Sequence, residues 1–159
     1  MTIKEYNECV KNSADRVYCF VIKQVKDSWI AEDIVQDSFM KLWEKKELVD
    51  KQKAKTYLYR IAYNNIVDNF RKNKYFVNES NIIEQETRID YSDAKEIIDK
   101  ALDTLPQIQK AIILLKDNEG YSYEEISQML DISMEKVKVY LYRARVKMKE
   151  MIVKKENIL

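Results

Sequence analysis

Basic side chains are concentrated near the C-terminal end of the sequence, where they could bind phosphate groups. No acidic residue occurs between positions 136 and 149, and the basic residues there are Lys136, Lys138, Arg143, Arg145, Lys147 and Lys149. Acidic residues predominate over basic ones from 96 to 135. Clustered Lys and Arg neutralise phosphates and supply much of the affinity of DNA-binding proteins. The formal net charge of only +1 therefore conceals a local basic segment, which favours nucleic-acid binding.

A second group of residues, between 57 and 72, mixes aromatic, amide and basic side chains. Aromatic rings stack on unpaired bases, amides read base edges, and Arg or Lys follows the backbone, so the mixture suits unpaired DNA. The candidates for such contacts are Asn64, Asn65, Arg71 and Lys72, together with the preceding basic loop from Lys46 to Lys55. Individual members such as Tyr57, Ile61 and Phe70 are equally well explained as core residues.

A third group is acidic. Asp33, Gln36 and Asp37 stand at positions i, i+3 and i+4, which places them on one face of a helix. Such a patch could dock on a basic helical partner and give orientation more than affinity. An ordinary solvent-exposed helix face explains the same residues, and on these residues alone that interpretation is favoured.

Other kinds of chemistry find no support. The chain has no histidine, and Cys9 and Cys19 are too few and too widely spaced for a disulfide framework or a zinc site, so we expect both as small buried residues. No phosphate loop or nucleophile and base pair is visible, so we expect no enzyme activity, no metal and no cofactor. No apolar run reaches the roughly 20 residues of a membrane span, so we expect a cytoplasmic protein without membrane insertion.

The elements that carry these residues are helices. Gly120 and Pro106 are the only glycine and proline, which disfavours hairpins and predicts an all-α fold. Apolar residues at helical spacing predict successive helices up to residue 75, with Ser28 as a possible N-cap of the second and a polar loop at 44–55. Apolar residues thin out and acidic ones increase at 76–93, which predicts a flexible linker. We therefore expect two small helical domains, 1–75 and 94–159, joined by the linker 76–93.

The last part of the chain predicts a helix-turn-helix. Ser122 and Glu125 have the spacing of a capping box before a short helix, and Ser133 can cap a longer one that continues through Met148. The turn between them contains Asp131, a residue type that tolerates the left-handed conformation. A solvated amphipathic hairpin has a similar pattern, but the loss of acidic residues from 136 to 149 and the two independent caps favour DNA binding. The core-facing stripe of the second helix is Val137, Leu141, Ala144, Met148 and Met151.

Taken in order, these segments resemble the extracytoplasmic-function (ECF) subgroup of the sigma-70 family of RNA polymerase sigma factors. Residues 31–39, AEDIVQDSF, resemble the segment with which that family grips the clamp helices of the polymerase β′ subunit. Residues 57–64, YLYRIAYN, continuing to Asp68 and Arg71, resemble its minus-10 recognition and melting helix. Leu105-Pro106, residues 120–126 and residues 137–145 resemble the domain that reads the minus-35 element.

The resemblance implies a non-enzymatic sigma factor that directs promoter recognition and transcription initiation. It implies as partners the bacterial RNA polymerase core, promoter DNA and an anti-sigma factor. The residues implied for core binding are Asp33, Gln36 and Asp37; those for the minus-10 element are Asn64, Asn65, Arg71 and Lys72; those for the minus-35 element are Ser122, Lys136, Lys138, Tyr140 and Arg143.

Departures from the family pattern concern base specificity. Tyr57 stands where tryptophan is common, Glu135-Lys136 where Gly-Thr is frequent, and Val139 and Tyr140 where polar or basic residues are usual. Glu135 would repel phosphate or accept a hydrogen bond from cytosine, and Tyr140 could contact a thymine methyl group. Two alternatives remain: a free-standing dimeric helix-turn-helix regulator, and a helical adaptor protein without DNA binding.

Overall fold

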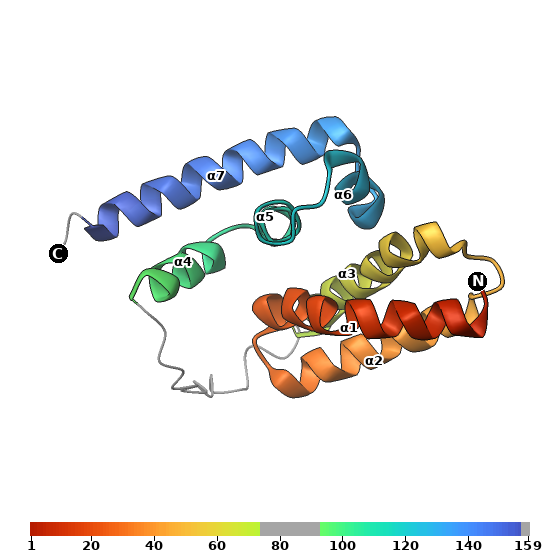
Figure 1. Cartoon of the computed structure of the whole chain (residues 1–159). Helices are drawn as coiled ribbons and strands as arrows, with labels where there is room; N and C mark the ends of the chain where they lie inside the picture. Colours follow the sequence, from red (N-terminus) through yellow and green to blue (C-terminus); the bar gives the residue numbers. More distant parts are fainter. Residues whose placement is uncertain (74–92, 157–159) are drawn as a thin grey trace.

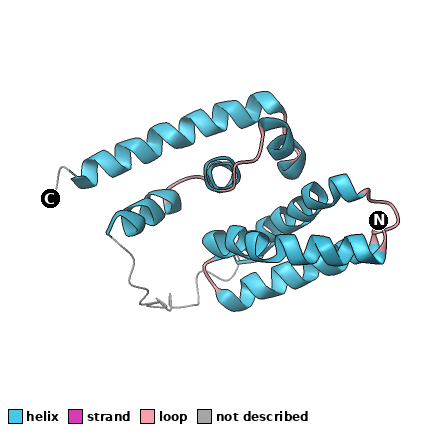
Figure 2. Cartoon of the chain, in the orientation of Figure 1, coloured by secondary structure: helices cyan, strands magenta, loops and turns pink. Residues whose placement is uncertain are grey.

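The computed structural model describes residues 1–73 and 93–156, and within them every regular element is a helix (Figures 1 and 2). The first set is α1 (Ile3–Val25), α2 (Ser28–Glu44), the 3-10 turn η1 (Lys51–Lys53) and α3 (Ala54–Asn73). The second set is α4 (Asp93–Asp103), α5 (Gln107–Ile113), which continues into the π-helical turn η2 (Leu114–Asn118), α6 (Tyr123–Leu130) and α7 (Met134–Glu156). The all-α prediction is confirmed. The predicted linker, 76–93, lies outside the described residues except for Asp93.

Local capping explains where the first helices begin. At the start of α1 the hydroxyl of Thr2 accepts a hydrogen bond from the Glu5 amide and the Glu5 carboxylate accepts one from the Thr2 amide, a complete capping box. The cap of α2 was predicted one residue too late: Asp27, not Ser28, accepts hydrogen bonds from the first amides of the helix. A carboxylate satisfies these unpaired amides and also favours the positive end of the helix dipole, so Asp27 is the stronger cap.

Helices α1, α2 and α3 form a three-helix bundle. Each contributes apolar side chains at helical spacing, so that one stripe per helix is removed from water. The fully or nearly fully buried members include Val17, Phe20 and Val21 from α1, Ala31 and Leu42 from α2, and Leu58, Ala62 and Ile66 from α3. This bundle holds the acidic patch on α2 and the aromatic and amide segment on α3 in fixed orientations.

The second set of helices contains the predicted helix-turn-helix. The capping box of Ser122 and Glu125 is confirmed, and Ser133 accepts a hydrogen bond from the Lys136 amide at 3.2 Å. Asp131 has the left-handed conformation expected of the turn, with φ of 55°. Helix α7 runs from Met134 to Glu156 and so includes the predicted stretch through Met148 and the predicted stripe residue Met151.

The two sets of helices pack against each other, with α6 over α3 and α5 over α1 (Figure 1). This contact was not among the predictions from the sequence. The prediction that both cysteines are buried is wrong for Cys19, which is exposed on α1, whereas Cys9 is half-buried.

Candidate nucleic-acid interface

Helix α7 separates apolar and basic side chains as the sequence predicts. Val137, Leu141 and Ala144 are buried against the rest of the second helical set. The predicted DNA-contact residues Lys136, Lys138 and Arg143 are all exposed, whereas Tyr140 is half-buried and packs against the core. The exposed aromatic residue of this helix is Tyr142, two positions further on. Sequence spacing could have found it, since 142 lies opposite the buried stripe and 140 lies beside it.

Some basic residues of α7 bind polar groups of the protein itself, and others do not. The guanidinium of Arg145 donates two hydrogen bonds to the Asp117 carboxylate, at 2.5 and 3.1 Å, and this raises the pKa of Arg145. Lys147 donates to the Thr104 carbonyl at 2.9 Å. Within the described residues Lys136 and Arg143 have no ion-pair partner. Their charges are therefore available for a phosphate backbone.

The α3 residues predicted to contact the minus-10 element differ in their exposure and in their hydrogen bonds within the protein. Asn64 and Lys72 are exposed, and Arg71 forms an exposed ion pair with Asp68 at 2.8 Å. Asn65 is half-buried, and its amide nitrogen donates to the Asp37 carboxylate at 2.9 Å while its oxygen accepts from Lys41 at 3.2 Å. Both ends of the Asn65 amide are thus occupied by α2, which makes Asn65 a link between the helices.

The loop that precedes α3 is fixed at its beginning. The amino group of Met1 donates to the carbonyls of Lys46 and Val49, at 2.8 and 3.1 Å, and the Val49 side chain is buried. The Lys51 and Lys53 side chains are exposed in η1. These contacts present the basic side chains of the loop next to the start of α3.

The acidic patch on α2 is exposed at Asp33 and Gln36, while Asp37 is half-buried and forms an ion pair with Lys41 at 3.0 Å. Gln36 also lines an apolar groove between α1 and α2, whose other lining residues include Met40 and Trp43, both exposed. Polar groups beside exposed apolar side chains are typical of protein interfaces. The patch therefore has the composition of a docking surface for another protein.

A buried hydrogen-bond network joins the two helical sets. The Tyr59 hydroxyl donates to one Glu119 carboxylate oxygen at 2.7 Å and accepts from the Tyr121 hydroxyl at 3.3 Å, and the two rings meet edge to face. Burial raises the pKa of the Glu119 carboxyl, although the Tyr59 hydrogen bond and then the nearby charges of Arg16, Lys23 and Lys55 oppose that shift. Burial, followed by the same hydrogen bonds, also raises the pKa of Tyr59. The second Glu119 oxygen is buried and has no hydrogen-bond partner among the described residues.

Arg60 forms a second link between the sets. Its guanidinium donates two hydrogen bonds, at 2.6 and 2.9 Å, to the carbonyl of Gln128 near the end of α6, where carbonyls lack helical partners. A shallow recess lined by Arg60, Asp131, Ser133 and Lys136 lies beside this contact. The start of α7 therefore faces α3, and the two candidate DNA surfaces lie close to each other.

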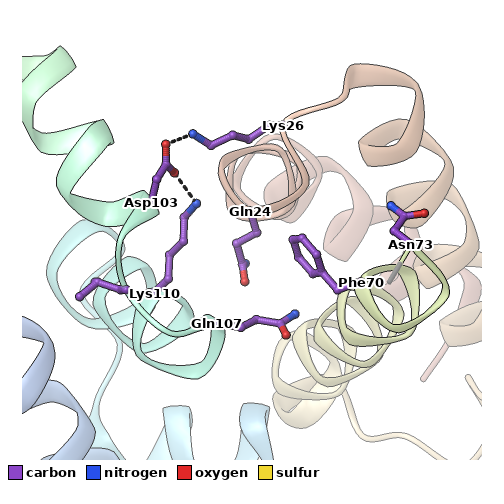
Figure 3. Close-up of a pocket in the computed structure, with 8 residues that line it drawn as sticks. Gln24, Lys26, Phe70, Asn73, Asp103, Gln107 and Lys110 are labelled. Carbon is purple, nitrogen blue, oxygen red and sulfur yellow. Dashed lines mark hydrogen bonds and ion pairs between the residues drawn. The ribbon is translucent and has the colours of Figure 1, made fainter. Parts of the chain in front are cut away.

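A cavity of about 560 Å³ lies at the other end of the contact, between α1, α3 and α5 (Figure 3). Its rim carries the Asp103 carboxylate, which pairs with Lys26 and with Lys110, the latter at 2.8 Å. Burial alone would raise the pKa of Asp103, but these two lysines lower it; burial lowers the pKa of Lys110 despite its partner. Gln24 points into the cavity, and its amide oxygen has no partner among the described residues.

Two kinds of site find no support in this part of the chain. Within 1–73 and 93–156, no group of His, Cys, Asp and Glu side chains could hold a metal ion. Each helix there is also too short or too polar to cross a bilayer.

Comparison with known proteins gives consistent matches along the chain. Residues 9–75 match the family description Sigma-70 region 2, and residues 95–148 match Sigma-70, region 4. The chain is similar to the ECF RNA polymerase sigma factor SigM of Bacillus subtilis, at 28% identity over 94% of each chain. It is 30% identical to the RNA polymerase sigma factor SigV of Bacillus subtilis, covering 93% of this chain and 91% of the relative.

A solved structure has the same fold. The sigma factor RpoE from Bartonella quintana, crystallised in complex with the anti-sigma factor NepR, superimposes with a TM-score of 0.76 at 24% identity. The alignment covers 94% of this chain and 98% of that chain. The similarity extends over both helical sets.

Proposed function

Because the chain belongs to the ECF subgroup of the sigma-70 family and is an RNA polymerase sigma factor, we propose that its two helical sets divide promoter recognition between them. Residues 1–75 form the domain that binds the polymerase core and opens the minus-10 element. Residues 94–159 form the domain that reads the minus-35 element, and residues 76–93 connect the two. The observation that carries this assignment is a pair of exposed cations on α7, Lys136 and Arg143, which have no ion-pair partner among the described residues and lie away from the buried stripe of a doubly capped helix-turn-helix.

Contact with the minus-35 element requires α7 to enter the major groove. A helix of this kind turns its outer face and its first turns toward base edges, and its flanking cations meet phosphates. Lys136, Lys138 and Arg143 are exposed for this purpose. Ser122, whose side-chain oxygen caps α6, still has a hydroxyl proton to donate to a phosphate. Tyr140 is half-buried, so only the exposed part of its side chain can contact the DNA.

Contact with the minus-10 element uses the loop at 46–55 and the exposed side of α3. Asn64 reads or captures an unstacked base, and Arg71 and Lys72 follow the backbone. Asn65 supports this surface through its hydrogen bonds to α2. The protein performs no covalent step; it stabilises the opened duplex by binding.

The two domains have to separate before both elements can be bound at once. Elements named minus-35 and minus-10 lie about 25 base pairs apart, or roughly 85 Å at 3.4 Å per step. A compact chain of this length has a radius of gyration of about 15 Å, so it is only about 40 Å across. A connection the length of 76–93 can span up to about 60 Å, enough to supply the missing reach once α3 and α6 part. The arrangement in which α6 packs on α3, here called closed, is therefore not that of the promoter complex.

The core polymerase is the first partner in this proposal. We assign Asp33, Gln36 and Asp37, with the adjacent apolar groove, to the β′ clamp helices, where a basic helical surface would match the patch. An anti-sigma factor that covers the same face would compete with the core. A cytoplasmic location follows from the location of the polymerase.

Reconstitution tests the proposal. The purified chain is added to core polymerase, and transcription is measured from a set of promoters. We expect a discrete subset to become active, and Asp33→Arg to weaken core binding about tenfold. Asp15→Arg, an equally exposed site on α1, is the matched control and should bind the core normally. Failure to bind core polymerase would contradict the proposal.

The same samples distinguish the two alternatives. A free-standing regulator predicts a stable dimer and DNA footprints without polymerase, which a sigma factor does not. A helical adaptor predicts that Lys138→Glu with Arg143→Glu leaves activity intact, whereas the sigma assignment predicts loss of promoter-specific transcription.

A further inference from the structure

The outer face of α7 carries apolar side chains that the fold does not use. Val139, Tyr142 and Val146 are 45%, 71% and 40% exposed. At 3.6 residues per turn these three positions lie within about 60° of one another and on the opposite side of the helix from the buried stripe. An exposed row of this kind costs solvation energy in the free protein, so it indicates a surface that becomes covered in a complex.

Basic residues border this row on both sides. Lys136 and Arg143 lie on one flank, and Lys138 and Lys149 on the other, each within about 50–90° of the centre of the row. A helix that lies in the major groove has phosphates along both walls and base edges along the floor. The charges therefore match the walls, and the apolar row between them is left to face the floor.

Among the base edges of the major groove, the 5-methyl group of thymine is the apolar one. Resting on the proposed function, we propose that Val139 and Tyr142 recognise thymine methyl groups of the minus-35 element and so determine part of its sequence. These residues are in the second and third turns of α7, the part of a recognition helix that reaches bases. Their positions along the axis differ by about 4.5 Å, so they contact thymines one or two base pairs apart.

Glu135 extends the same row by one turn toward the helix start. It is exposed, and within the described residues it has no ion-pair partner. A carboxylate accepts a hydrogen bond from the amino group of cytosine and is repelled by the acceptors of guanine. The row therefore selects a pyrimidine-rich strand, with cytosine nearest Glu135 and thymines nearest Val139 and Tyr142.

The test removes single methyl groups from the DNA. Holoenzyme reconstituted with core polymerase first selects active promoters from a library randomised over the minus-35 element. Each selected thymine is then replaced by deoxyuridine, which lacks only the methyl group. We expect each contacted position to lose about fourfold in promoter binding. Val139→Ala and Tyr142→Ala should each lose binding to thymine DNA but become insensitive to deoxyuridine at their own position.

Val153→Ala is the matched control, because Val153 is 44% exposed near the far end of the same helix and should keep the wild-type preference for thymine. The proposal is overturned if deoxyuridine has no effect on the wild type, if the variants lose thymine and deoxyuridine DNA equally, or if Tyr142→Ala acts by dissociating a dimer of the chain. Each of these outcomes presupposes an active promoter. Absence of any promoter activity would instead contradict the sigma function itself.

Discussion

Removal of one hydroxyl group should release the two domains from each other. In Tyr59→Phe the ring that packs against Phe20 and Tyr121 remains, but the Glu119 carboxylate loses its hydrogen-bond donor. Its other oxygen already lacks a partner within the described residues, so a buried carboxylate would be left without any donor there. A hydrogen bond to a charged group contributes about 1.5–3 kcal/mol. The closed-to-open equilibrium should therefore shift about ten- to a hundredfold toward the open state.

Single-molecule energy transfer can measure this shift. One dye is attached to the exposed Cys19 and the other to a cysteine introduced by Glu150→Cys, in a Cys9→Ser background, so that each domain carries one label. We expect the high-transfer population of the parent protein to decrease in Tyr59→Phe. In the proposed function only open molecules fit the promoter complex, so the apparent affinity for core polymerase and promoter should increase by the same factor until opening is complete.

Tyr63→Phe is the control for the substitution itself. Tyr63 lies one turn further along α3, is buried, and within the described residues has no hydroxyl hydrogen bond; burial raises its pKa to about 12. This variant should keep the transfer distribution of the parent. If Tyr59→Phe leaves the distribution unchanged, or if Tyr63→Phe shifts it equally, the assignment of the closed state to the Tyr59 and Glu119 hydrogen bond is incorrect.

Three further predictions concern substitutions of single residues. Because burial raises the pKa of Glu119 in the closed state, protonation of its carboxylate favours closure. The closed fraction should therefore increase as pH falls from neutral toward the ordinary glutamate pKa of about 4.3. Glu119→Gln should abolish this pH dependence in the same energy-transfer assay. Gly120 has φ of +79° with open space around its Cβ position, so Gly120→Ala should lower the free energy of unfolding in urea by about 1 kcal/mol through backbone strain alone. Arg143→Gln should reduce the salt dependence of promoter binding by about one phosphate contact, while Arg145→Gln should reduce it less, because Asp117 already pairs with Arg145.

Much of the fold could be predicted because its determinants are local. The capping box of Ser122 and Glu125, the left-handed turn at Asp131 and the buried stripe of α7 each depend on spacing within a few residues. The correct helix order followed from these signals. The cap of α2 was misplaced by one residue because Asp27 and Ser28 are both good caps, and only the backbone conformation decides between neighbouring candidates.

The surfaces were less predictable than the helices, because side-chain freedom depends on packing between elements. Asn64 and Asn65 have the same chemistry in the sequence, yet one is exposed and the other is held at both ends by α2. Tyr140 and Tyr142 differ in the same way on α7. In each pair a difference of 100° or 200° around the helix determines which residue can reach a partner, so helical phase is a better guide than residue type.

The contact between α3 and α6 was not predicted, because the sequence analysis assigned the residues of α3 that make it to DNA binding. Tyr59 and Arg60 belong to the aromatic and basic segment that predicts binding of unpaired DNA, and in the closed protein Glu119 and the Gln128 carbonyl occupy them. Separation of the domains would free the Arg60 guanidinium on the same helix that carries Asn64. Opening therefore does more than extend the reach of the chain. In the proposed function it also returns a cation to the surface assigned to single-stranded DNA, so domain closure and promoter opening compete for Arg60.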